Sequence, residues 1–286
     1  MNYIRKIQTH DGYEACVDLQ KAVWGFADRE LVPSRTMIVA QKHGGCVLGA
    51  FAGDGRLVGF ALSYASFHKG RFGQHSSMLA VLPEFRDQGL GRRLKLAQRE
   101  DALERRIAVV TWTFDPLEAR NAHLNLNKLG AVAAAYHADL YPQSASDLYS
   151  GLGTDRCLVE WWIGSARVRR RLDAATPSDP SAAADVAAAR CVNYAHADAG
   201  GLPEPGEPIL NITSDRLLVE IPSDISQIKR QQFELAQAWR ENTRQVFRHY
   251  LAAGYRATQL LFDREPAEPA GRRAFYLLEK GTAHED

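Results

Sequence analysis

The stretch that most constrains the fold runs from Met78 to Leu94. An apolar run ends at Pro83, and a loop with two glycines, Gly89 and Gly91, leads directly into a helical pattern. At such a strand-to-helix turn the first backbone N–H groups of the helix point outward without partners, and the helix dipole adds partial positive charge. Glycines also let an anion approach the backbone closely. The stretch therefore predicts a site for a pyrophosphate group.

The pattern differs from two common phosphate-binding loops. No Gly-Lys-Ser/Thr triplet follows, as in a Walker loop, and the GxGxxG spacing of dinucleotide-binding folds is absent. Arg86 and Arg92 can add charge-assisted hydrogen bonds to phosphate oxygens. The alternative interpretation is an ordinary turn that uses its glycines only for backbone geometry.

Strand and helix patterns alternate around this stretch. Asp11 and Glu14 have the spacing of a capping box, which predicts a helix from there to about Gly25. Two apolar runs, 46–52 and 57–64, flank Asp54-Gly55 and predict a β-hairpin. The order predicts a mixed α/β sheet with helices on both sides. Further strands are expected at 77–82, 109–114, 131–140 and 157–163, and further helices at 89–107 and 118–129.

The composition changes after Trp162. Residues 166–208 are rich in Ala, Pro, Gly, Asp and Arg, which predicts a linker with a short helix at about 182–190. Residues 209–286 repeat the order strand, helix, strand, strand found over 109–163, and Gly130 and Gly254 follow the two helices. We therefore expect a partial duplication. The predicted domains are 1–165, 166–208 and 209–286, with strands at 217–221, 257–262 and 274–279 and one long helix at 226–253 in the last.

Charge and cysteine content argue against several classes of function. The 286 residues carry a net charge of +1, from 35 basic and 34 acidic side chains, which argues against a dedicated nucleic-acid binder. The four cysteines form no CxxC pair, so no metal site is expected. The N-terminus has no apolar leader, and no run approaches the ~20 apolar residues that cross a bilayer. We expect a cytoplasmic protein without a nucleic-acid or membrane partner.

The motif has a family resemblance. The run V-x-P-x-x-R-x-x-G-x-G, at Val81, Pro83, Arg86, Gly89 and Gly91, closely resembles the acyl-CoA-binding motif of the GCN5-related N-acetyltransferase (GNAT) superfamily. The order of elements over about residues 3–163 resembles that superfamily too. The resemblance implies a GNAT acyl-CoA N-acyltransferase fold, with a C-terminal αβ extension that resembles part of a GNAT half. It also implies acetyl-CoA or another acyl-CoA as co-substrate, and no metal.

The resemblance also assigns residues to the co-substrate. The motif strand should separate from its neighbour and pair its backbone with the pantetheine arm, and the glycine loop should hold the pyrophosphate. An Asn-led helix that ends in Lys-Leu-Gly, here at 128–130, is a second family feature. The residues assigned in this way are Leu79, Ala80, Val81, Arg86, Gln88, Gly89, Leu90, Gly91, Arg92, Asn121 and Asn125, with Arg93 and Lys95 as weaker candidates for other phosphates.

The catalytic residues depart from the family pattern. Family members often carry a tyrosine four residues before that glycine, as the acid that protonates the leaving thiolate, but this chain has Leu126 there. The acid is then absent, or is supplied by Tyr136, Tyr141 or Tyr149. Asp115 is slightly favoured as base because it follows a strand beside the expected acyl site. The candidates for the base are Asp115, Glu84, His123 and His75.

The sequence does not determine the acyl acceptor. The leading hypothesis is direct attack on the thioester by the amine of a small molecule such as an amino acid. An α-amino group costs only about 1 to 1.4 kcal/mol to deprotonate at pH 7, against about 4.6 kcal/mol for a lysine-type amine, so it needs a weaker base. The alternatives are a protein or peptide N-acetyltransferase, or a non-catalytic CoA-binding interaction protein.

Two further expectations are conditional. An arginine in the acyl pocket would favour a carboxylated donor such as succinyl-CoA, and the candidates are Arg35, Arg71 and Arg120. Apolar side chains exposed on a free face of the last long helix would support a homodimer, and the candidates are Trp239, Phe247 and Tyr250.

Overall fold

The computed structural model describes residues 2–142, 151–173, 189–198, 200–263 and 272–281. The chain forms two compact units. Unit 1 comprises Met1–Trp112, Ser144–Ser150 and Trp162–Gly164, and unit 2 comprises Thr113–Gln143, Gly151–Trp161 and Ser165–Asp286. This division falls inside the first expected domain, 1–165, and the expected domain boundaries stay predictions.

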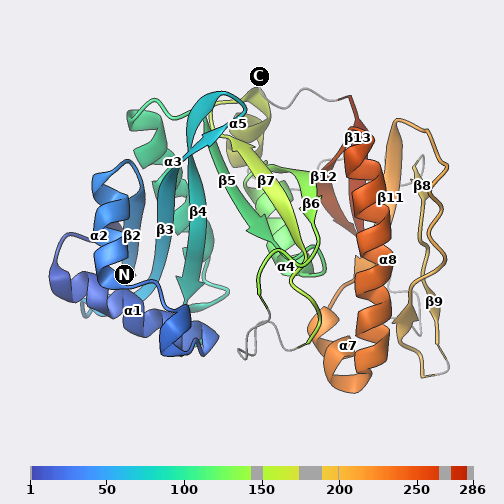
Figure 1. Cartoon of the computed structure of the whole chain (residues 1–286), viewed down its shortest axis with the longest axis horizontal. Coiled ribbons are helices and arrows are strands. Elements are labelled where there is room, and N and C mark those ends of the chain that lie inside the picture. Colours follow the sequence, from blue (N-terminus) through green and yellow to red (C-terminus); the bar gives the residue numbers. More distant parts are fainter. Residues whose placement is uncertain (1, 143–150, 174–188, 199, 264–271, 282–286) are drawn as a thin grey trace. The chain divides into compact units, whose positions relative to one another are not determined.

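Unit 1 is built on a sheet that begins at the N-terminus (Figure 1). Its first four strands are antiparallel neighbours, and the fifth runs parallel to the fourth. The Asp54-Gly55 hairpin is confirmed, because it joins the second and third strands. The strands, in sheet order, are β1 (Tyr3–Lys6), β2 (Cys46–Phe51), β3 (Leu57–His68), β4 (Arg71–Val81) and β5 (Val109–Phe114), of which the residues up to Trp112 belong to this unit.

Strands β3 and β4 are longer than the sequence predicted. They pair out to His68 and Arg71 and are joined by the two-residue turn Lys69-Gly70. Both turn residues have positive φ, 48° and 77°, as the tightest hairpin turns require. The turn went unrecognised because lysine is an uncommon residue at positive φ.

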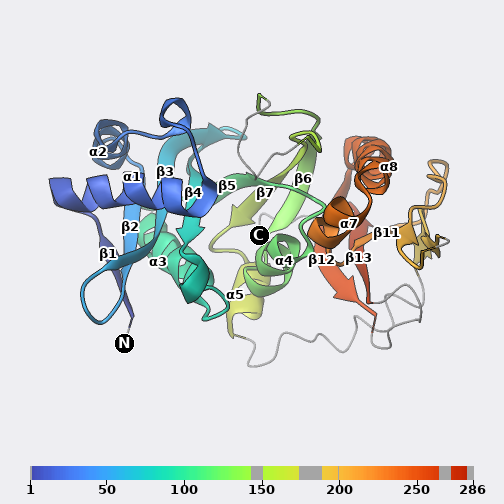
Figure 2. The ribbon, with the colours of Figure 1, turned by 90° about the horizontal axis from the view of Figure 1, so that it is seen from below.

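Helices cover both faces of the unit 1 sheet (Figure 2). The helices α1 (His10–Trp24) and α2 (Ser34–Lys42) lie on one face and α3 (Leu90–Glu104) lies on the other. The core on the first side includes Met37 and Phe60, and the core on the α3 side includes Leu90 and Leu94, all fully buried. The helix α2 was not predicted from the sequence.

The start of α1 corrects one prediction. Thr9 is the N-cap, and its hydroxyl accepts a hydrogen bond of 3.2 Å from the N–H of Gly12. The expected capping box of Asp11 and Glu14 is therefore wrong by two residues, since Thr9 offers an equally good capping oxygen earlier in the chain. The predicted end is confirmed, because Gly25 closes the helix at a φ of 64°.

Unit 2 holds a second set of paired strands. Their order is β7, β6, β12, β13, β11, β8, and all neighbours are antiparallel except β11 and β8. Two further short strands pair separately. The bounds are β6 (Val132–His137), β7 (Arg156–Trp162), β8 (Arg190–Cys191), β9 (His196–Ala197), β10 (Pro203–Glu204), β11 (Arg216–Pro222), β12 (Tyr255–Phe262) and β13 (Arg273–Lys280).

The helices of unit 2 differ from the predicted ones at two points. The single helix expected at 226–253 is two helices, because Gln232 adopts an extended conformation (φ −153°) and separates them. The segment 166–208, expected to be a linker, contains α5 and the strands β8 to β10, and its expected helix at 182–190 lies largely outside the described residues. The elements are α4 (Ala119–Ala122), the π-helix η3 (His123–Lys128), α5 (Ala166–Asp173), α7 (Ile225–Gln231) and α8 (Phe233–Ala252).

Within unit 2, α8 packs along one face of the strands, and α4 and α5 lie on the other (Figures 1 and 2). Three large side chains of α8 itself are buried: Trp239, Phe247 and Tyr250, with exposed fractions of 0%, 0% and 1%. Trp239 donates from its indole N–H to the carbonyl of Pro203, and Tyr250 donates to that of Ile209. The exposed apolar face that would support a homodimer is therefore not formed by these side chains.

The two halves of unit 2 repeat a local pattern. Gly130 and Gly254 have φ of 75° and 91° and follow helices, and each precedes a strand. Both strands shift register against the next strand at the third residue after the glycine, at Ala133 in β6 and at Ala257 in β12. Ala133 and Ala257 are themselves cross-strand partners. The partial duplication itself stays a prediction.

Among the helices of the described segments, none is long and apolar enough to cross a bilayer.

Candidate functional site

The end of β4 has one unpaired edge. On one side β4 pairs with β3 as far as Val81, but on the other its pairing with β5 ends at His75 and Thr111. Ser77 forms a bulge, because Ser76 and Met78 are partners of consecutive residues on β3. Over the described residues, no strand pairs with 76–81 on the side away from β3. We call this stretch of backbone the open edge; the N–H and C=O groups on its side away from β3 can pair with an extended ligand.

The glycine loop follows the open edge directly. A short 3₁₀ turn, η2 (Pro83–Phe85), leads to Arg86, whose Nε donates to the carbonyl of Val81 at 3.2 Å. Gly89 is the N-cap of α3 at a φ of 73°, a conformation that favours glycine. A Cβ at Gly91 would meet only Leu79, at 3.8 Å, so the space in front of it is open.

No side chain caps α3. The first N–H groups of the helix, at 90–92, therefore face this open space without a protein acceptor. Partial positive charge, absent Cβ atoms and a nearby guanidinium together form a cradle that fits a pyrophosphate. The residues predicted for the loop thus come together in one place, next to the open edge that carries Leu79, Ala80 and Val81.

The charged groups around the loop have different surroundings. Arg86 and Gln88 are exposed, and the Gln88 side chain donates to the carbonyl of Glu84 at 3.2 Å. Arg93 is exposed and donates to the carbonyl of Asn2. The Glu84 carboxylate lies on the surface, 3.5 Å from Arg56.

The position of Lys95 differs from the one expected from the sequence. It was expected to reach a solvent-side phosphate, but its side chain is buried beneath α3, with 2% exposed. Its Nζ donates to the Ser76 hydroxyl at 2.7 Å and to the Gln98 amide oxygen at 3.3 Å, and it lies 3.8 Å from the centre of the Trp112 ring. Burial lowers the pKa of Lys95 to about 7.

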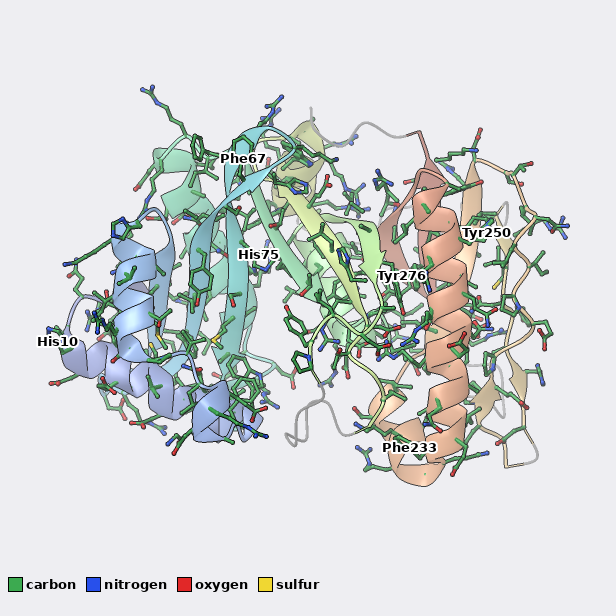
Figure 3. The ribbon with its side chains drawn as sticks, viewed as in Figure 1. His10, Phe67, His75, Phe233, Tyr250 and Tyr276 are labelled. Atoms are coloured by element: carbon green, nitrogen blue, oxygen red, sulfur yellow. The ribbon has the colours of Figure 1, made fainter. Side chains whose placement is uncertain are left out.

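His75 lies where β4 and β5 stop pairing (Figure 3). Its Nδ1 is 3.1 Å from the Thr111 hydroxyl, which fixes the ring against β5. Burial, followed by the charge of Lys95, lowers the pKa of His75 below its ordinary value. The imidazole is therefore neutral at pH 7 and able to accept a proton.

In unit 2, Asp115 has several partners. Arg240 of α8 donates to both carboxylate oxygens, at 3.0 and 2.5 Å, and Arg156 lies 3.7 Å away. The N–H of Leu117 also donates to it at 2.9 Å. These contacts engage the lone pairs of Asp115 that a base would use, and they suit a structural role better than proton transfer.

The helix α4 continues into the π-helical turn η3, a kind of distortion frequently found at functional sites. Asn121 is exposed, whereas Asn125 is buried. His123 lies on the same segment; its Nδ1 is buried without a partner among the described residues, and burial lowers its pKa. Leu126 stands where the family tyrosine would be and is fully buried, so it packs in the core.

Two of the three candidate tyrosines can be compared. The hydroxyl of Tyr136 donates to Asp155, and burial raises its pKa, with Asp155 as a further cause. Tyr141 is 40% exposed, and its hydroxyl lies 3.1 Å from that of Thr113 at the end of β5. Tyr149 lies outside the described residues. Tyr141 is therefore the better placed of the two to exchange a proton with a ligand.

Some residues with unusual surroundings were not found from the sequence. Glu118 is partly buried at the start of α4, and burial raises its pKa, followed by the charges of Asp115 and Asp224. Arg240 and Arg167 bind groups distant in sequence, and Arg167 donates to the carbonyl of Gly130 at 3.0 Å. No local pattern marks such residues, because their partners are set by the tertiary fold.

The arginines considered for a carboxylated donor lie on the surface. Arg35, Arg71 and Arg120 are all exposed, so none lines a buried acyl pocket. Within the part of the chain that the structure describes, no three His, Cys, Asp or Glu side chains gather closely enough to hold a metal ion.

Unit 1 thus places a parallel strand pair with an open edge next to a glycine-rich, uncapped helix start. This arrangement in an α/β domain is suited to an extended ligand that carries phosphate groups. Residues 10–130 match the model of the acetyltransferase (GNAT) family, and this match covers less than half of the chain. The resemblance found in the sequence is confirmed over these residues, and so is a mixed α/β fold with a C-terminal extension beyond them.

Solved structures with similarity to the chain include three bacterial acetyltransferases. The ribosomal-protein-S18-alanine N-acetyltransferase from Escherichia coli is 19% identical over 58% of this chain and 96% of that one, with a TM-score of 0.47. A putative acetyltransferase from Salmonella typhimurium, solved with its cofactor acetyl-CoA, is 18% identical over 58% and 95%, with a TM-score of 0.47. A GNAT-family acetyltransferase from Streptococcus pneumoniae is 18% identical over 56% and 98%, with a TM-score of 0.45. A comparison with curated proteins finds no match.

Proposed function

We propose that the protein is an acyl-CoA-dependent N-acyltransferase that transfers an acetyl or other short acyl group to the amine of a small molecule. The observation that carries the proposal is the continuity of the open edge, 76–81, with the glycine loop at the start of α3. The edge offers an extended arm its hydrogen-bonding partners, and the loop offers a pyrophosphate its N–H donors. The match of residues 10–130 to the acetyltransferase family supports the same class of reaction.

In this proposal the thioester lies along the open edge. The backbone of Leu79, Ala80 and Val81 pairs with the pantetheine arm, and a free N–H of this strand stabilises the oxyanion that forms on attack. The loop residues Arg86, Gln88, Gly89, Leu90, Gly91 and Arg92 hold the pyrophosphate, and Asn121 and Asn125 remain proposed contacts of the co-substrate.

His75 is our choice for the base that takes the amine's proton. It adjoins the open edge and is neutral at pH 7, whereas Asp115 is engaged by Arg240 and Glu84 lies near Arg56 on the surface. His123 keeps a buried, unpartnered Nδ1 and is the second choice. Tyr141 is the proposed acid for the leaving thiolate, because the residue is 40% exposed and Tyr136 is held by Asp155.

A weak base favours one class of acceptor. Since the pKa of His75 is lowered, it suits an α-amino group of pKa about 7.7 to 8.0 better than a lysine side chain of about 10.4. An amino acid or related amine is therefore the proposed acceptor. A peptide N-terminus has the same chemistry, so a protein N-acetyltransferase is the alternative, and a non-catalytic CoA-binding protein is the third reading.

The experiment is a search for the acylated product. The purified chain is incubated with acetyl-CoA and, in separate reactions, with pools of amino acids, small amines and peptides, and the products are identified by mass spectrometry. Acylated amino acids or amines support the proposal, and acylated peptides alone favour the alternative. Gly89→Asp serves as control, because a carboxylate in the loop should repel the pyrophosphate and abolish both binding and product.

A further inference from the structure

A buried lysine without an acidic partner lies beneath the point where β4 and β5 separate. We call this point the apex; it consists of His75 and Ser76 on β4 and Thr111 and Trp112 on β5. Pairing ends with His75 and Thr111, and the Nζ of Lys95 contacts the next residue on each strand, Ser76 at 2.7 Å and the ring of Trp112 at 3.8 Å. Among the described residues no carboxylate pairs with Lys95.

Burial of an unpaired ammonium group is costly, so its presence needs an explanation. An apolar residue would fill the same space under a sheet without that cost. Among the described residues, Lys95 has three compensating contacts: the Ser76 hydroxyl, the Gln98 amide oxygen and the π-face of Trp112. The hydroxyl and amide oxygens accept hydrogen bonds from Nζ, and the ring face attracts its positive charge, so the pocket suits the lysine head group.

The other face of the apex carries His75. Successive residues of a strand point to opposite faces, so His75 and Ser76 project to opposite sides of the sheet, and so do Thr111 and Trp112. The apex is thus held on one face by the His75–Thr111 contact and on the other by Lys95. Lys95 is also the charged group that acts on His75 through the strand.

Other titratable groups nearby have their own partners or lie apart from the pair. Asp101, further along α3, binds Lys6 and Arg105, at 2.5 and 2.9 Å. Tyr64 of β3 is the cross-strand partner of His75, and burial raises its pKa, so it stays neutral. Cys46 of β2 is buried, and its pKa is raised to about 12, so it is also neutral.

We propose that Lys95 is a positioning residue for acyl transfer, which holds Ser76 and Trp112 together at the apex, on the face of the sheet opposite His75. The inference rests on the proposed function, because it assigns His75 to the reaction. Without the lysine head group, the two strands lose their link at the position where the open edge begins. Without its charge, His75 holds its proton at a higher pH and is a less available base.

The test compares Lys95→Met, which keeps the length of the side chain and removes its charge, with Lys42→Met, an exposed lysine at the end of α2. Hydrogen–deuterium exchange is measured on peptides from the apex and from β1 and β2. The rate of acyl transfer is measured from pH 5 to 9 by CoA release. Acetyl-CoA affinity is measured by calorimetry, because the loop at the start of α3 should be unaffected.

We expect faster exchange of the apex peptides in Lys95→Met, with β1 and β2 unchanged and acetyl-CoA affinity within about threefold of wild type. The rate should fall about tenfold at pH 7, and the acid limb of the kcat/KM profile should move up by about half a pH unit or more. Lys42→Met should match wild type in every measurement.

Unchanged exchange at the apex would overturn the proposal whatever the activity. Faster exchange with an unmoved acid limb would overturn the role of Lys95 toward His75. If wild type itself transfers no acyl group to any acceptor, the proposed function fails, and so does the assigned role in transfer. The structural link at the apex would still be decided by exchange alone.

Discussion

The guanidinium of Arg240 binds the carboxylate of Asp115 through two hydrogen bonds, of 3.0 and 2.5 Å, across a sequence separation of 125 residues. Arg240 also donates to the carbonyl of Leu152 at 3.0 Å. Asp115 lies within the residues that match the acetyltransferase family, and Arg240 lies in the C-terminal extension. The extension is therefore an integral part of unit 2, and it fixes the residue that follows β5.

Replacement of Arg240 by Met should destabilise the protein. The change leaves the Asp115 charge without its main partner, and loss of one member of a buried pair costs about 3 kcal/mol. Urea unfolding of Arg240→Met measures this. Arg248→Met, an exposed arginine on the same helix, should change the free energy of unfolding by less than about 0.5 kcal/mol. Equal stability of the two variants would show that the Asp115 contact contributes little.

Gly91→Ala should separate binding from stability. Its Cβ would meet only Leu79 at 3.8 Å, and alanine in a helix gains about 0.5 to 1 kcal/mol over glycine. The variant should unfold no more easily than wild type, yet bind acetyl-CoA at least about tenfold more weakly, since the methyl group occupies the cradle. Calorimetry and thermal unfolding measure the two effects. Unchanged affinity would place the pyrophosphate elsewhere.

Gly89→Ala is the companion variant. The φ of 73° at Gly89 costs a residue with a Cβ about 1 to 2 kcal/mol, although no atom lies near the added carbon. Gly89→Ala should therefore lower the free energy of unfolding, in contrast to Gly91→Ala. A neutral effect would indicate that the loop adopts another conformation.

Lys95 should make stability depend on pH. Burial lowers its pKa from the ordinary 10.5 to about 7, so between these values the unfolded chain binds a proton that the folded chain does not. The stability of wild type relative to Lys95→Met should therefore rise with pH, by up to about 1.4 kcal/mol per unit from pH 7 to 10, and be flat below pH 7. Urea unfolding of both proteins from pH 6 to 10 tests this. A difference that does not vary with pH would contradict the buried, uncharged state of Lys95 at high pH.

Tyr136→Phe and Tyr141→Phe form a matched pair. Loss of the Tyr136 hydroxyl leaves Asp155, which is 0% exposed and also binds Arg244, one donor short, so the variant should lose about 1 to 3 kcal/mol of stability and keep its kcat. Tyr141→Phe should keep its stability and lose about 10²-fold in kcat if Tyr141 protonates the thiolate. Steady-state kinetics and urea unfolding distinguish the two, and the reverse pattern would exchange their roles.

The parts of the fold and site that could be predicted depend on short sequence patterns. The hairpin at Asp54-Gly55, the helix end at Gly25 and the glycine loop at 86–92 each depend on residues close in the chain. A glycine at positive φ or an uncapped helix start is visible in a short stretch of sequence. The fold class followed, because the order of these elements resembles a known superfamily.

The missed features depend on distant contacts. Lys95 falls in a helical pattern with charged neighbours, and only packing against Ser76 and Trp112 shows that it is buried. The engagement of Asp115 by Arg240 depends on the packing of α8, so the aspartate looked available in the sequence. The break at Gln232 carries no glycine or proline, and its helix-forming neighbours predicted one continuous helix.

The most direct measurement is a time course of free thiol released from acetyl-CoA by purified protein, with and without amino acids. We expect release that depends on the acceptor, continues over many turnovers and is lost in Gly89→Asp. No acceptor-dependent release from any amino acid, small amine or peptide, with acetyl-CoA bound, would contradict an N-acyltransferase and leave a CoA-binding protein.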